Sequence, residues 1–159
     1  MSLEWEVLLR VLLAGVLGAA VGFDRERTDK PAGLRTHMLV SMGSALFAAI
    51  GVLIVNRAMG DDDVVRLDIL RVVAAVATGV GFLGGGAILR GDHRVRGLTT
   101  AAGIWVNAGI GLAAGLGQII LAIGATVFAV IIIAALGGGF YGTGRDSRAP
   151  SNKESGEVT

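Results

Sequence analysis

The chain has 159 residues, a length that fits a single domain. Apolar residues make up 53% of it and charged residues 17%, whereas a soluble domain usually carries about 25% charged residues. The net charge of +1 gives no overall field that would favour a nucleic acid, so no nucleic acid partner is expected. The absence of cysteine excludes disulfides and cysteine-ligated metals, and two histidines are too few for a metal site built from several histidines.

The charged residues are unevenly distributed, and one long part of the chain has none. No Asp, Glu, Lys or Arg occurs between Gly97 and Gly144. As a single helix, this stretch would exceed twice the hydrocarbon thickness of a bilayer, which is about 30 Å. It must therefore turn once, and the glycines of Gly115-Leu116-Gly117-Gln118 favour a turn there. A soluble fold of this size could not easily bury so much apolar surface, so the sequence predicts an integral membrane protein.

Five apolar spans predict an all-α, polytopic membrane helix bundle with five transmembrane helices. Helices are expected because an isolated span in lipid must satisfy its own backbone hydrogen bonds, and the alternation of a β-barrel strand is missing. Residues 1–140 are expected to form the transmembrane domain, and the polar residues 141–159 a disordered cytoplasmic tail. The predicted spans are Val7–Phe23, His37–Val55, Val72–Leu89, Leu98–Leu116 and Gln118–Phe140.

The first span begins after acidic residues and contains Arg10. The acidic start and a weak cleavage signal argue against a signal peptide and favour an N-terminus outside the cell. Arg10 lies close enough to the end of the span for its side chain to extend to the membrane surface. Where the span leaves the lipid, Asp24, Arg25 and Glu26 form either a solvated boundary with a local ion pair or a charged site at the cytoplasmic mouth of the bundle.

The region around the start of the third span carries two groups of charges. Asp61-Asp62-Asp63 could attract a divalent cation, but consecutive acids usually repel each other and stay solvated, so no metal site is expected. Asp68 and Arg71 are three residues apart and share a helical face, so they can form a pair at the helix start. Gly79–Gly84 matches G-x-G-x-x-G, but no acid follows about twenty residues later, so neither a nucleotide nor any other cofactor is expected.

The fourth span opens with Thr99 and Thr100, which can cap exposed backbone N–H groups or bind a ligand. Asn107 is predicted to lie about two turns beyond Thr99 on the same helical face. This end of the span could therefore hold an anion, including a lipid phosphate. The simpler alternative is ordinary positive charge at a cytoplasmic boundary. The basic residues nearby are Arg90, Arg94 and Arg96.

Glycines spaced four residues apart recur in three spans. A glycine inside a helix costs about 1 kcal/mol relative to alanine, which is hard to justify in water. In lipid, small residues let two helix backbones approach closely, so we interpret these faces as packing surfaces for other helices, a second copy or another membrane protein. The pairs are Gly18 with Gly22, Gly81 with Gly85, and Gly111 with Gly115.

Lysine and arginine are concentrated in alternate connections, which predicts the orientation of the chain in the membrane. The basic connections follow the first and third spans, and the last basic group follows the fifth. The N-terminus is therefore expected outside and the C-terminus in the cytoplasm. These basic residues are Arg25, Arg27, Lys30, Arg35, Arg90, Arg94, Arg96, Arg145, Arg148 and Lys153.

Several long motifs resemble the MgtC/SapB family of bacterial inner-membrane proteins. They occur in order, and the resemblance covers about residues 7–135. Asp24 stands where the family often has Glu, and Ala75 where Gln is common. No soluble C-terminal domain of the kind that longer members carry is expected. The motifs are GAAVGFDRER (18–27), AGLRTHMLVSMGSALF (32–47), DILRVVAAVATGVGFLGGGAILR (68–90) and GLTTAAGIWVNAGIGLAAGLG (97–117).

The resemblance implies a five-helix membrane domain and a set of polar signature residues. Members of this family are linked to growth under Mg²⁺ limitation and to acid or host stress, and some are thought to act on the F-type ATP synthase. The signature maps onto Asp24, Arg25, Glu26, Arg35, Thr36, Asp68, Arg71, Thr99 and Thr100 here. With Asn107 added, these residues form the predicted polar site at the membrane boundary.

Two functions from different classes remain open at this point. The first is a non-enzymatic inner-membrane protein that supports Mg²⁺ homeostasis or stress adaptation by binding another membrane complex. The second is a transporter or channel for an ion or small solute, using polar residues between the helices. An enzyme is the weakest alternative because the sequence shows no pairing of a nucleophile with a base.

Overall fold

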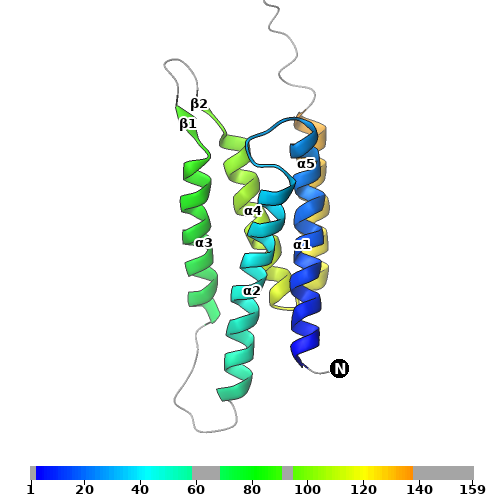
Figure 1. Cartoon of the computed structure of the whole chain (residues 1–159), viewed down its shortest axis with the longest axis vertical. Coiled ribbons are helices and arrows are strands. Elements are labelled where there is room, and N and C mark those ends of the chain that lie inside the picture. Colours follow the sequence, from blue (N-terminus) through cyan, green and yellow to red (C-terminus); the bar gives the residue numbers. More distant parts are fainter. Residues whose placement is uncertain (1–2, 59–68, 91–94, 138–159) are drawn as a thin grey trace, which may run out of the picture.

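The computed structural model describes residues 3–58, 69–90 and 95–137, and it is a bundle of helices (Figure 1). A short antiparallel ribbon connects the third and fourth helices: strand β1 (Leu89–Arg90) pairs with strand β2 (Val95–Arg96). The all-α prediction with five helices is confirmed. The helices are α1 (Leu3–Arg27), α2 (Leu34–Ala58), α3 (Ile69–Gly86), α4 (Leu98–Gly115) and α5 (Ile119–Gly137).

Four of these helices, α1 to α4, are long and apolar enough to cross a membrane, while the apolar part of α5 that the structure describes, Ile119–Ala135, is shorter. Helices α1 and α2 extend past the predicted spans because helical hydrogen bonding continues beyond the apolar residues. The third helix ends slightly before the predicted Leu89: α3 ends at Gly86, and Leu89 pairs with Arg96 in the ribbon. The predicted end at Phe140 and the predicted tail lie outside the described residues.

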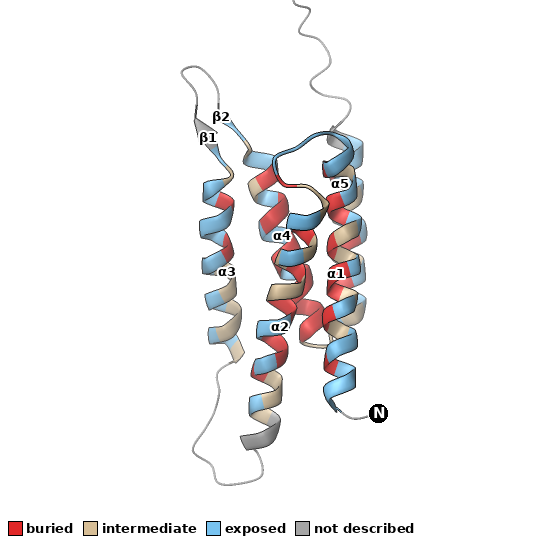
Figure 2. Cartoon of the chain, in the orientation of Figure 1, coloured by how far each residue is buried: buried red, intermediate tan, exposed pale blue. Residues whose placement is uncertain are grey.

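Helices α1, α2 and α4 pack together and form the centre of the bundle, with α5 against α1 and α4. Helix α3 lies at the edge and contacts α4 and, less extensively, α2. Figure 2 shows this difference: the buried residues concentrate where the central helices face one another, and α3 is largely exposed. Many large side chains point outward, including Val16, Leu39 and Phe82. An apolar exterior of this kind suits a hydrocarbon solvent.

Glycine sets the spacing between the central helices. A Cβ atom added at Gly18 would lie 2.6 Å from the carbonyl oxygen of His37, and one at Gly22 would lie 2.8 Å from Cα of Leu34. A Cβ at Gly111 would lie 2.2 Å from the carbonyl oxygen of Ser41, and Gly115 meets the backbone of Ala45 in the same way. Helices α1 and α4 therefore approach the α2 backbone at distances that no larger residue permits.

The third predicted packing pair behaves differently. A Cβ added at Gly81 or Gly85 would meet no atom of the described residues within 4 Å. These two glycines therefore pack against no described helix of the same chain. Helix α3 instead contacts α4 through Gly84, where an added Cβ would lie 3.4 Å from the carbonyl oxygen of Ala101. The spacing of four residues occurs on both the packed and the open side of helices, so it does not identify the packed side.

The predicted turn between the fourth and fifth spans is confirmed at residues 116–118. Gly117 has a φ of 81°, a left-handed conformation that glycine adopts without strain. The N–H of Gly117 donates to the carbonyl of Ala114, and the N–H of Gln118 donates to that of Ala113. These two bonds are the Schellman arrangement that satisfies the last carbonyls of a helix. The Arg10 guanidinium of α1 lies over this turn, because a Cβ added at Gly117 would be 2.9 Å from it.

Candidate functional site

Most of the predicted site residues lie at one end of the bundle. At this end α1 finishes, α2 and α4 begin and α3 finishes (Figure 1). We call it the basic end; the basic residues at this end include Arg25, Arg27, Lys30, Arg35 and Arg96. Arg71 lies at the start of α3, at the opposite end of the bundle, and Asp68 is outside the described residues. The structure therefore brings Asp24, Arg25, Glu26, Arg35, Thr36, Thr99 and Thr100 to the basic end and leaves Arg71 apart from them.

Glu26 binds the start of α2 at the basic end. Its carboxylate accepts a hydrogen bond of 2.9 Å from the backbone N–H of Leu34, the first residue of α2. A negative charge at a helix N-terminus satisfies an unpaired N–H and interacts favourably with the helix dipole. A Cβ added at Gly33 would lie 1.8 Å from Oε2 of Glu26, so only glycine leaves room for this contact. The bond links the end of α1 to the start of α2 across the connection between them.

Arg25 and Asp24 have different surroundings although they are adjacent in sequence. The Arg25 side chain is buried, with 5% of the residue exposed, and its Nε has no hydrogen-bond partner. Asp24 is half-buried, and its backbone carbonyl accepts a bond of 2.9 Å from the Thr28 hydroxyl. Arg35 and Thr36 have exposed side chains at the start of α2. Arg25 is thus a buried cation between the half-buried Asp24 and the exposed Glu26.

The two threonines that open α4 also differ. Thr100 is buried and Thr99 is exposed. The predicted shared face of Thr99 and Asn107 is wrong, because eight residues rotate a helix by two turns plus about 80°; Thr100 is the residue that shares the buried face. Neither threonine caps the helix. The N-cap residue is Gly97, with φ 89° and no side-chain cap bond, and a Cβ there would lie 2.0 Å from the Ala87 carbonyl oxygen.

Asn107 connects α4 to α2 inside the bundle. Its amide nitrogen donates a hydrogen bond to the backbone carbonyl oxygen of His37, and both residues are fully buried. His37, Ser41 and Ser44 are buried polar residues of α2 that were not among the predicted site residues. Their spacing of four and three residues places them on one helical face, which is the signal in the sequence that could have identified them.

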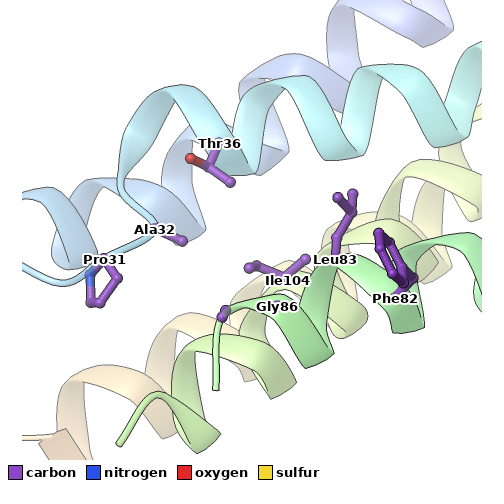
Figure 3. A pocket seen from close by; sticks show the side chains of 8 residues that line it. Pro31, Ala32, Thr36, Phe82, Leu83, Gly86 and Ile104 are labelled. Atoms are coloured by element: carbon purple, nitrogen blue, oxygen red, sulfur yellow. The ribbon is translucent and has the colours of Figure 1, made fainter. Parts of the chain in front are cut away.

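A pocket of about 430 Å³ lies at the basic end between α2, α3, α4 and the connection after α1 (Figure 3). Thr36 is a polar residue in a lining that is otherwise apolar. The pocket is therefore suited to apolar groups such as lipid chains rather than to ions. Its lining includes Pro31, Ala32, Thr36, Phe82, Leu83 and Ile104.

Arg10 pairs locally at the other end of the bundle. Arg10 forms an ion pair with Glu6 one turn earlier in α1, and its side chain is 22% exposed. Its guanidinium also lies at the C-terminus of α4, where a positive charge is favourable. Within residues 3–58, 69–90 and 95–137, no three His, Asp or Glu side chains gather as a set of metal ligands.

Comparisons with known proteins find similarity to one family over most of the chain. The family model described as the MgtC family matches residues 11–138. The chain is 46% identical over 99 residues to Protein SrpB of Synechococcus elongatus, covering 57% of this chain and 52% of that protein. It is 43% identical over 99 residues to the Putative magnesium transporter YhiD of Escherichia coli K12, covering 59% and 43% respectively.

A longer match is found with Protein MgtC of Brucella abortus, which is 40% identical over 126 residues, covering 78% of this chain and 49% of that protein. The chain therefore matches about half the length of these curated relatives. No solved structure matches the chain.

Proposed function

The chain belongs to the MgtC family, and on that premise we propose that it is a non-enzymatic protein of the bacterial inner membrane that binds another membrane complex. Through this interaction it supports Mg²⁺ homeostasis or adaptation to stress. The F-type ATP synthase is a candidate partner. The basic end faces the cytoplasm in this proposal, because lysine and arginine are retained on that side during insertion.

The observation that carries the proposal is an open stripe of small residues on α3. Ala74, Thr78, Gly81 and Gly85 are all exposed, and their spacing of four, three and four residues places them on one face of the helix. No described atom lies within 4 Å of a Cβ added at either glycine. The glycines at 18, 22, 111 and 115 are in contact with α2 instead. The stripe on α3 is thus a packing face that no described helix of this chain covers.

A face of this kind favours another helix over lipid. In a bilayer, hydrophobicity alone does not drive helices together, because lipid chains are as apolar as leucine. Small residues let a second backbone approach closely, which adds van der Waals contact that flexible lipid chains supply less well. Thr78 adds a hydroxyl that can hydrogen-bond across such an interface. The partner that fits is therefore a transmembrane helix with its own small-residue face.

The stripe can be tested by filling it without disturbing the fold. Gly81→Leu and Gly85→Leu place a large side chain on the stripe, where the described part of the chain leaves open space. Gly79→Leu is the matched control, because Gly79 is also open but is rotated from Gly81 by about 160°. We expect Gly81→Leu and Gly85→Leu to abolish both growth at low Mg²⁺ and crosslinking to the partner in native membranes, while Gly79→Leu retains both. Equal behaviour of the three variants at equal membrane levels would refute the proposal.

Transport of an ion or small solute is the second candidate. It is favoured by the name of the relative YhiD, which refers to magnesium transport, and by the polar residues buried between α1, α2 and α4. Purified protein in liposomes distinguishes the two functions. Mg²⁺ uptake that Asp24→Asn or Asn107→Leu abolishes would support transport. Absence of uptake, together with the α3 results above, would support partner binding.

A further inference from the structure

In the part of the chain that the structure describes, four buried polar side-chain atoms inside the bundle have no hydrogen-bond partner. They are Nε of Arg25, Nε2 of His37, Oγ of Ser41 and Oδ1 of Asn107. The four residues are between 0% and 5% exposed. An unpaired buried polar group costs about 1–3 kcal/mol, so four of them in one region of an otherwise apolar bundle require an explanation.

The chemistry of each atom follows from the bonds that its neighbours make. Nδ1 of His37 lies 2.9 Å from the carbonyl oxygen of Gly33, which can only accept, so Nδ1 carries the proton. In the neutral ring, Nε2 is then an acceptor. The Asn107 amide nitrogen donates to the His37 carbonyl, which leaves Oδ1 as a second acceptor. The Ser41 hydroxyl can donate and accept, and Nε of Arg25 can only donate.

Contacts between the helices place these groups in adjacent layers. A Cβ added at Gly103 of α4 would lie 3.5 Å from Nε2 of His37, so the tip of the ring reaches α4 one turn before Asn107. Ser41 is one turn beyond His37 in α2, and Gly18 of α1 meets both residues. On the side of the basic end, Arg25 follows one turn after Gly22, which contacts Cβ of His37.

The combination of groups selects the kind of ligand. An anion would meet two acceptors, Nε2 of His37 and Oδ1 of Asn107. A metal ion would find only uncharged ligands in the set and the positive charge of Arg25 about one turn of α1 away from the layer of His37. A small neutral molecule can donate hydrogen bonds to both acceptors and form another with the Ser41 hydroxyl. Such a molecule satisfies the unpaired atoms of His37, Ser41 and Asn107. Water meets these requirements, and buried waters typically make about three such bonds.

We propose that His37, Ser41 and Asn107 form an internal hydration site between α1, α2 and α4. Water bound there donates to Nε2 of His37 and Oδ1 of Asn107, and Arg25 Nε binds water on the side of the basic end. Hydration gives His37 a proton-accepting nitrogen in contact with water, although the residue is closed off from the lipid. The site is independent of partner binding through α3, and neither proposal depends on the other.

Nitrogen-15 NMR of the full chain in lipid bilayers tests the state of His37 directly. The chain has only two histidines, so a His93→Gln variant assigns the His37 signals. We expect a neutral ring with the proton on Nδ1 and with magnetisation reaching Nε2 from water protons. A proton on Nε2 in the neutral ring, or the absence of transfer from water, would overturn the proposal.

Cysteine accessibility supplies a second test, because the native chain has no cysteine and each variant carries a single thiol. The thiolate is the reactive form and is favoured by water, so hydrocarbon protects a thiol. We expect Ag⁺ to block Ser41→Cys from later maleimide labelling, although Ser41 is 0% exposed. Leu39→Cys, at nearly the same depth and 68% exposed toward lipid, should stay unblocked.

Thr36→Cys, exposed at the basic end, reports that the reagent reaches the protein. If Ag⁺ blocks Thr36→Cys but leaves Ser41→Cys as unreactive as Leu39→Cys, the hydration site is refuted. Should Ser41→Cys fail to fold, the NMR measurement on the native chain decides the question alone.

Discussion

Replacing Gly111 with alanine tests the close approach of α4 to α2. The added Cβ would lie 2.2 Å from the Ser41 carbonyl oxygen and 2.9 Å from its Cα and C, so it meets backbone rather than a flexible side chain. Real Cβ contacts below 3.0 Å essentially do not occur. The two helices must therefore separate locally by roughly 1 Å, which also pulls the Asn107 amide away from the His37 carbonyl.

The expected change in the free energy of unfolding follows from three contributions. Overpacking costs about 1–3 kcal/mol. Loss of an interhelical hydrogen bond in a membrane protein costs about 0.6 kcal/mol on average. Alanine in place of glycine restores about 1 kcal/mol of helix propensity. We therefore expect Gly111→Ala to lower the free energy of unfolding by about 0.5–2.5 kcal/mol.

Gly109→Ala is the matched control, since Gly109 is in the same helix and a Cβ there meets nothing within 4 Å among the described residues. It should leave stability unchanged or raise it by up to about 1 kcal/mol. The assay is reversible unfolding of both variants in mixed micelles, followed by helix content. If Gly111→Ala is as stable as Gly109→Ala, the described α2–α4 contact is incorrect.

Three further predictions concern the connections and the topology. Gly33→Ala should displace the Glu26 carboxylate from the Leu34 N–H and lower the free energy of unfolding by about 1 kcal/mol. In a double-mutant cycle with Glu26→Ala the two effects should not add, and additive effects would exclude their coupling. Gly117→Ala should cost about 1 kcal/mol in an unfolding titration, because its φ of 81° strains an alanine; Gly124→Ala, at an open position within α5, should not. Reporter fusions after Lys30 and Arg94 should give cytoplasmic signals and one after Asp62 an external signal; a reversed pattern would invert the proposed orientation.

The number and position of the helices could be predicted because lipid imposes a simple rule. Each span must satisfy its own backbone hydrogen bonds, so long apolar stretches such as His37–Val55 identify helices directly. The turn at Gly117 was predictable for a similar reason, because an uncharged stretch of that length must reverse once. The end of α3 at Gly86 was not, since it depends on the pairing of Leu89 with Arg96 across the ribbon.

The interior of the site was harder to predict because sequence spacing does not show which helical face is packed. The pairs at positions 18 and 22 and at 81 and 85 have the same spacing, yet the first lies against α2 and the second is open. Asn107 was included because it was placed on one helical face with Thr99, whereas the structure places it on the buried face with Thr100. His37 was considered only as a metal ligand and set aside, although Ser41 and Ser44 follow it on the same face. Glu26 was interpreted as part of either a solvated boundary or a charged site, and its bond to the start of α2 appears only in three dimensions.

The central proposal is that α3 presents its small-residue stripe to another membrane protein. The most direct measurement is photo-crosslinking in native membranes with a photoreactive side chain at position 81, compared with position 46 on the lipid-facing side of α2, where Leu46 is 49% exposed. We predict a specific protein adduct from position 81, absent in the Gly85→Leu background, and only lipid adducts from position 46. Lipid adducts alone from both positions would contradict the proposal.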